Sequence, residues 1–134
     1  MWSKRLTSHK PEFPNRADII RHLLQQLVEK KMLESWVHLE LVEEGGWFNN
    51  LLSGKAPWVE VAMRDDGFEL NLGFRKNQSA ELPQLPKSWQ EAGKRQWKVS
   101  ASEFPTLCDW IDLAFSKACS NSPTRKLSGW IEGL

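Results

Sequence analysis

The segment from Trp58 to Phe74 constrains the fold most, because it contains two alternating runs around Asp65, Asp66 and Gly67. Apolar and polar residues alternate in both runs, and Asp-Gly between such runs is the strongest local signal of a β-hairpin. Placing Asp66 and Gly67 in the loop predicts these pairs: Val59 with Phe74, Val61 with Leu72, Met63 with Leu70, Arg64 with Glu69, and Trp58 with Arg75. The apolar pairs then share one face, so a half-buried hairpin is predicted.

Two helices and a further strand are predicted around this hairpin. Apolar residues at helical spacing predict a helix from Asn15, its N-cap, to about Glu34. Alternation with period two predicts a strand over residues 36–43. Ser100 and Glu103 fit a capping box for a second helix. The expected fold is therefore α+β, with an antiparallel sheet of about three to five strands flanked by an N-terminal and a C-terminal helix on one face.

The remaining segments set the expected organisation of the chain. Residues 1–14 form a basic N-terminal arm, residues 15–119 a single α+β domain, and residues 120–134 a C-terminal tail. Residues 44–57 fit either a strand or a loop. Residues 76–98 are polar and proline-rich in their first half, and a short strand is predicted over residues 97–99. The tail has apolar residues at helical spacing, although glycines weaken it as a helix, and it either packs on its own sheet or docks on a partner.

Composition limits the classes of protein that this chain can belong to. With 134 residues and a net charge of +1, it is the size of one domain and lacks the basic excess of typical nucleic-acid binders. No apolar run is long enough to cross a membrane and no apolar leader opens the sequence, so a cytoplasmic protein is expected. Cys108 and Cys119 would lie about 16 Å apart on one helix, too far to form a disulfide, and are interpreted as small buried hydrophobes.

Neither a catalytic nor a metal-binding signature occurs in the sequence. His9, His22 and His38 have no second histidine or cysteine at metal-ligand spacing, and no nucleophile elbow, phosphate loop or dinucleotide fingerprint is present. We therefore expect no enzyme activity, no metal and no cofactor. An enzyme would need a pocket that joins Asp65 or Asp66 to another titratable group.

The eight tryptophans, in a chain without tyrosine, suggest two alternative binding surfaces. The first is a protein-binding surface, for a protein or peptide partner or a second copy in a homodimer, and comprises Trp47, Phe48, Trp58, Glu60, Glu69, Trp130 and Ile131. The alternative is a surface for single-stranded nucleic acid, and comprises Trp89, Lys94, Arg95 and Trp97. The adjacent acidic stretch and the near-neutral net charge argue against the nucleic-acid surface.

The order of elements and several segments resemble the secretion-chaperone-like family, which includes the bacterial type III secretion chaperones and their sensory-regulator relatives. The segments that carry the resemblance are PWVEV (residues 57–61), ELNLGF (69–74), LPKSW (85–89) and QWKVSASEFPTLCDWIDLAF (96–115), within residues 15–119. The resemblance implies a small dimeric α+β domain that binds an unfolded stretch of another protein and performs no chemistry. The family has no fixed ligand motif that would assign roles to particular residues.

Overall fold

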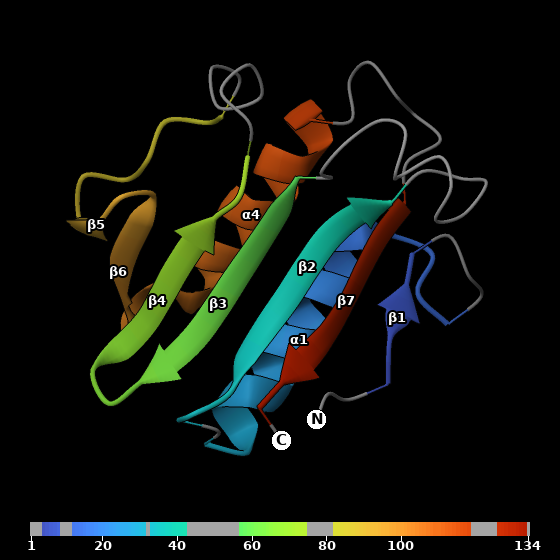
Figure 1. Ribbon diagram of the computed structural model, residues 1–134, viewed down its shortest axis with the longest axis horizontal. Helices are drawn as coiled ribbons and strands as arrows, with labels where there is room; N and C mark the ends of the chain where they lie inside the picture. Colours follow the sequence, from blue (N-terminus) through green and yellow to red (C-terminus); the bar gives the residue numbers. More distant parts are fainter. Residues whose placement is uncertain are drawn as a thin grey trace.

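The computed structural model describes residues 4–8, 12–31, 33–42, 57–74, 82–118 and 126–133 (Figure 1). The described elements are β1 (Leu6–Thr7), α1 (Arg16–Glu29), β2 (Trp36–Val42), β3 (Trp58–Arg64), β4 (Gly67–Leu72), β5 (Gln90–Gly93), β6 (Gln96–Ser100), a 3-10 turn (Ala101–Glu103), α4 (Phe104–Ala118) and β7 (Lys126–Glu132). Residues 44–56, for which the sequence fits either a strand or a loop, and the predictions for Trp47, Phe48, Arg75 and Cys119 lie outside the described residues.

The strands form one antiparallel sheet in the order β1-β7-β2-β3-β4-β6-β5. Figure 1 shows both helices on the same side of this sheet. The α+β class is confirmed, but the described part of the chain has seven strands instead of the expected three to five. The second helix is also not the last element, because the chain continues into β7.

The hydrophobic core lies between the sheet and the helices. α1 buries one stripe, and the central strands alternate between buried and half-buried residues, as their sequence period requires. The fully buried side chains include Ile19, Ile20, Leu23, Leu24, Leu27, Val37, Leu39, Val59, Val61, Leu70, Leu107, Ile111 and Phe115. α1 follows Asn15 as predicted, although the Asn15 side chain makes no capping hydrogen bond, and it ends at Glu29 instead of near Glu34.

The β3–β4 hairpin is present, but its predicted register is wrong by two residues. Val59 pairs with Leu72 and Arg64 pairs with Gly67, so Asp65 and Asp66 form the turn. Gly67 has φ +151°, and a side chain there would collide with the carbonyl oxygen of Val99 on β6. Glycine is therefore required here both by its positive φ, directly after the turn, and by the close approach of β6. A two-residue shift preserves the face of every residue, so the predicted burial is still correct.

The C-terminal segment is a strand in the interior of the sheet. β7 pairs with β2 from Val42↔Lys126 to Trp36↔Glu132, so the described part of the tail packs on its own sheet and the helical spacing is not realised there. A Cβ atom at Gly129 would lie 2.7 Å from methyl carbons of Leu23 and Leu39. The glycine that weakens a helix therefore allows α1 to approach the sheet closely.

Residues 82–103 contain one predicted strand and one that was missed. β6 includes the predicted residues 97–99, and β5 pairs with it in a bulged hairpin at the sheet edge. The predicted capping box is wrong, because Ser100 makes no side-chain capping hydrogen bond. Glu103 instead accepts a hydrogen bond of 2.7 Å from the Ser88 hydroxyl group, which ties the start of α4 to the segment before β5.

Candidate functional site

The candidate site lies on the sheet face opposite the helices and is built on three neighbouring strands. His38 on β2 pairs with Trp130 on β7 and with Glu60 on β3. Two residues further along β2, Glu40 pairs with Trp58 on β3. Because strand alternation directs these residues away from the helices, they share one face. We call Trp130, His38, Glu40, Trp58 and Glu60 the outer-face ladder.

His38 lies at the centre of the ladder and contacts all of its other members. Its Nδ1 atom is 3.1 Å from Glu60 Oε2, and its Nε2 atom is 3.4 Å from Glu40 Oε2. The imidazole ring is stacked with Trp58 at a centroid distance of 6.0 Å and lies 4.6 Å from Trp130. The side chain of His38 is only 16% exposed. The imidazole is therefore held between two indoles and two carboxylates.

The surrounding carboxylates keep this imidazole protonated at neutral pH. Burial lowers the pKa of His38, but hydrogen bonds to Glu40 and Glu60 raise it more, so its pKa is about 9 instead of 6.5. The hydrogen bond from His38 lowers the pKa of Glu40, against the opposing effect of burial. With both ring N–H groups donating, His38 bridges two negatively charged side chains on adjacent strands.

Arg5, immediately before β1, extends the ladder to the edge of the sheet. Its guanidinium lies over the Trp130 ring at 5.1 Å, and its NH2 group donates to Glu40 Oε1 at 2.8 Å. Its Nε–H group donates to the hydroxyl group of Ser128. A cation over an indole, paired with a carboxylate, combines cation–π attraction with a charge-assisted hydrogen bond.

Trp58 lies over a glycine that makes room for its ring. Gly73 donates its backbone N–H to the Trp58 carbonyl at 2.8 Å, and a Cβ atom at Gly73 would overlap the indole. The indole therefore occupies the space that a side chain at residue 73 would need, and it is half-buried there.

The structure gathers part of the predicted protein-binding surface. Trp58, Glu60 and Trp130 lie together in the ladder, and Glu69 is on the same face of β4, where it pairs with Arg64 at 3.0 Å. Ile131 does not belong to this surface, because it is 2% exposed and packs in the core on the opposite face. Its neighbour Trp130 points the other way, as strand alternation requires.

His38, Glu40 and Arg5 are the three site residues that are absent from both surfaces predicted from the sequence. The period-two pattern already put His38 on the same face as Glu40, so this part of the signal was available. Its contacts with Glu60 and Trp130 depend on which strands are neighbours, and Arg5 reaches the ladder only because β1 joins β7.

The four residues of the predicted nucleic-acid surface do not form a stacking platform. Trp89 is only 6% exposed and packs edge-on against Trp110, so no base can stack on it. Trp97 is half-buried against the core. Arg95 donates to the backbone carbonyl of Phe74, which leaves Lys94 as an exposed lysine at the β5–β6 turn.

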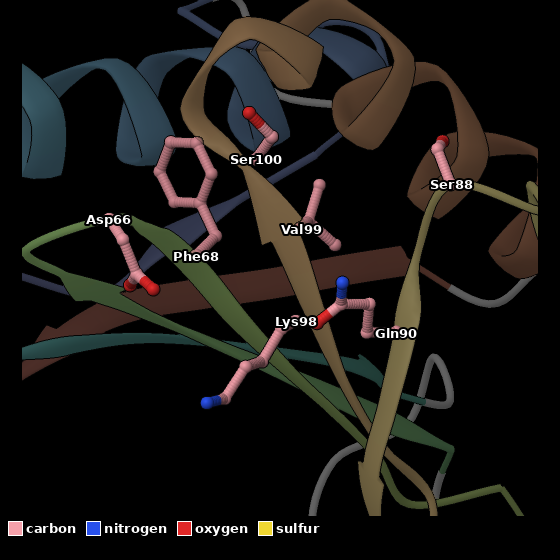
Figure 2. Close-up of a pocket in the computed structure, with 7 residues that line it drawn as sticks. All are labelled: Asp66, Phe68, Ser88, Gln90, Lys98, Val99 and Ser100. Atoms are coloured by element: carbon pink, nitrogen blue, oxygen red, sulfur yellow. The ribbon is translucent and has the colours of Figure 1, made fainter.

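A polar pocket of about 190 Å³ lies at the other end of the sheet, near the start of α4 (Figure 2). It is lined by Asp66, Phe68, Ser88, Gln90, Lys98, Val99 and Ser100. The pocket does join Asp66 to a second titratable group, Lys98, but both side chains are exposed. Figure 2 shows Lys98 extending away from Ser88 and Ser100, so the polar groups do not converge on one point. We therefore assign no chemistry to this pocket.

The other titratable groups considered from the sequence have structural surroundings. Cys108 is 3% exposed, and burial raises the pKa of its thiol to about 11, which keeps it protonated at neutral pH. His22 is exposed on α1, 3.1 Å from Gln26. Within the described ranges, no group of three or more His, Cys, Asp or Glu residues is arranged to hold a metal ion.

Comparison of the chain with protein-family models, with curated proteins and with solved structures found no match. The resemblance to the secretion-chaperone-like family therefore stays a prediction from the sequence. None of the helices in the described part of the chain is long and apolar enough to span a membrane.

Proposed function

We propose that this chain is a non-enzymatic protein-binding domain, and that the sheet face carrying the outer-face ladder holds a segment of a partner protein with basic side chains. The observation that carries the proposal is the packing of Trp58 and Trp130 around His38 on the face opposite both helices. Tryptophan is enriched at protein interfaces because it offers a large apolar area with few rotatable bonds.

The carboxylates on this face are each paired with a cation of the chain itself, so a basic partner segment would bind by replacing one of these cations, such as Arg5. Glu40, Glu60 and Glu69 are half-buried there, with side chains 25%, 31% and 20% exposed. Carboxylates that are already partly desolvated lose little further hydration when a cation binds beside them. The contact between Arg5 and Trp130 is an example of the arrangement that a partner's arginine would adopt.

The state of His38 supports a binding role over a catalytic one. A general base needs an unprotonated nitrogen and a pKa near the working pH. Both ring nitrogens of His38 face carboxylates within 3.4 Å, and its pKa is about 9. The imidazole is thus suited to hold the two carboxylates in place. The resemblance to the secretion-chaperone-like family supports the same class of function, including the chaperone-like role and the homodimer that it implies.

Affinity capture with matched surface variants tests this proposal. Asn71 lies beside Glu60 on β4 and is half-buried, so Asn71→Arg adds bulk and positive charge to the face without changing the core. Leu113→Ala is the control, since Leu113 on α4 is 49% exposed and on the helix side. Captured proteins would be identified by mass spectrometry, and each would then be purified and titrated calorimetrically.

The proposal predicts a partner that binds the wild type and Leu113→Ala equally and binds Asn71→Arg at least about tenfold more weakly. Circular dichroism checks that Asn71→Arg is folded. A partner whose affinity is unchanged by Asn71→Arg would contradict the assignment of this face. A stable homodimer that occupies the face, detected by light scattering, would replace the proposed partner with a second copy.

A further inference from the structure

The short strand β1 indicates where and how a partner segment can bind. β1 lies at the edge of the sheet beside β7 (Figure 1) and pairs with it at two positions, Leu6↔Gly129 and Thr7↔Ser128. β7 itself is seven residues long. So short a pairing supplies few backbone hydrogen bonds, and short edge strands are the weakest part of a sheet.

Side chains around β1 supply most of the specific contacts of this segment. Arg5 lies on the outer face, over Trp130 and against Glu40, while Leu6 packs on the hydrophobic core from the other face. Ser8 is fully buried, its N–H group donates to the Leu127 carbonyl at 2.8 Å, and its hydroxyl accepts from the Leu127 N–H at 2.9 Å. The edge thus recognises an arginine, an apolar residue and a serine in the order Arg-apolar-x-Ser.

We propose that this edge of β7 is a binding site for an extended partner segment of the type Arg-apolar-x-Ser, and that the chain's own residues 4–8 occupy it as an internal competitor. The inference rests on the proposed function and names the partner's chemistry. As in other cases of strand addition, backbone pairing with β7 aligns the segment, and its side chains provide the specificity. Cation–π contact with Trp130 and the ion pair with Glu40 select arginine.

Residues 4–8 occupy the β7 edge in the free chain, and a partner segment would bind there by displacing them. A tethered segment has an effective concentration on the order of millimolar, so a partner must bind more tightly or present several contacts at once. A partner that also covers the outer-face ladder presents several contacts at once, because Trp130 and Glu40 belong to both the ladder and the β7 edge. Displacement of Arg5 would thereby couple strand addition to binding on the face.

The test uses the full-length chain and a labelled peptide, Lys-Arg-Leu-Thr-Ser, which repeats residues 4–8. Arg5→Glu weakens the internal competitor, because it puts a carboxylate beside Glu40. Leu6→Asp weakens it independently, by placing a charge against the core, and replaces Arg5→Glu if that variant does not fold. Fluorescence anisotropy of the peptide measures its affinity, and light scattering measures the mass of each variant.

We expect the peptide to bind the weakened variant at least about tenfold more tightly than the wild type. Replacing its arginine with alanine should weaken binding about tenfold or more. Adding Trp130→Ala to the weakened variant should also reduce its affinity for the peptide about tenfold or more. Adding Leu113→Ala should leave this affinity unchanged.

Three results would overturn the inference: no saturable binding to either weakened variant, equal binding of the alanine peptide, or an arm-exchanged dimer of the wild type. A peptide that fails to bind, together with a protein partner that is lost in Asn71→Arg, would refute this site and leave the proposed function standing. If the peptide fails to bind and no protein partner is lost in Asn71→Arg, the proposed function is refuted as well.

Discussion

His38 on β2 and Glu60 on β3 lie opposite each other in the sheet, with Nδ1 and Oε2 3.1 Å apart. This pair joins two adjacent strands on the face that carries no helix, and Glu40 completes it from the other side of the imidazole. An exposed sheet face normally carries side chains that contact mainly solvent. Here a charged network between two tryptophans fixes the side chains in a defined arrangement, which favours recognition because less conformational entropy is lost on binding.

The pH dependence of stability should report the state of His38. The pKa of His38 is about 9 in the folded chain and 6.5 for the free side chain. Its stabilising contribution is therefore complete below pH 6.5 and is lost as the pH rises through 9. The free energy of unfolding should fall by on the order of 2 kcal/mol. This is less than the full pKa shift implies, because solvent screens the partly exposed carboxylates. Thermal melts from pH 6 to about 10 measure it.

Substitution at the histidines provides the control for this pH dependence. In His38→Gln the decline in stability between pH 6.5 and 9 should disappear, whereas His22→Gln, at an exposed position of α1, should retain it. The lowered pKa of Glu40 works in the opposite range. Its contribution is present above its ordinary pKa of 4.5 and is lost as the pH falls below that value. An unchanged decline in His38→Gln would assign the pH dependence to another group.

The close contact between β7 and α1 predicts a specific sensitivity at Gly129. Gly129→Ala should destabilise the fold by about 1–3 kcal/mol, because the new methyl group overlaps Leu23 and Leu39 in a core that cannot expand freely. Gly93→Ala is the matched control in the β5–β6 hairpin, where the nearest atom to an added Cβ is the Gln96 side-chain oxygen at 3.0 Å. Urea denaturation of both variants distinguishes them, and equal stability would show that α1 does not approach β7 so closely.

The environment of Cys108 predicts a thiol that does not react in the native state. With a pKa of about 11 and 3% exposure, Cys108 should remain unmodified by maleimide at pH 7.5 over a period in which the urea-unfolded chain is fully labelled. Peptide mass spectrometry separates its labelling from that of Cys119. Rapid native labelling of Cys108 would contradict the packing of α4 on the core.

The sequence predicted which face of the sheet each residue occupies better than it predicted which residues pair across neighbouring strands. Alternation assigned Val37, Val59 and Leu70 to the core, and this remained correct despite the wrong hairpin register. The register error came from reading Gly67 as a turn residue, whereas its small size is needed next to Val99 on β6. Such a requirement depends on β6, a strand distant in the sequence, and leaves no local signal.

The ladder and the C-terminal strand show the same limit. Leu127, Gly129 and Ile131 alternate toward the core, but a glycine has no hydrophobic signal, so the segment matched a helical period instead. His38 could be placed on the face of Glu40 from the sequence alone. Its contacts with Trp130 and Glu60 follow from the strand order, which joins segments about 90 residues apart and which no local pattern encodes.

The most direct test of the outer-face ladder is an NMR titration of the His38 imidazole in the full-length wild-type chain, with His22→Gln to assist the assignment. Our account predicts that His38 titrates with a pKa of about 9, and that Glu40→Gln and Glu60→Gln each move this pKa toward 6.5. A His38 pKa of 6.5 or below in the wild type would contradict the ladder and the binding surface that we build on it.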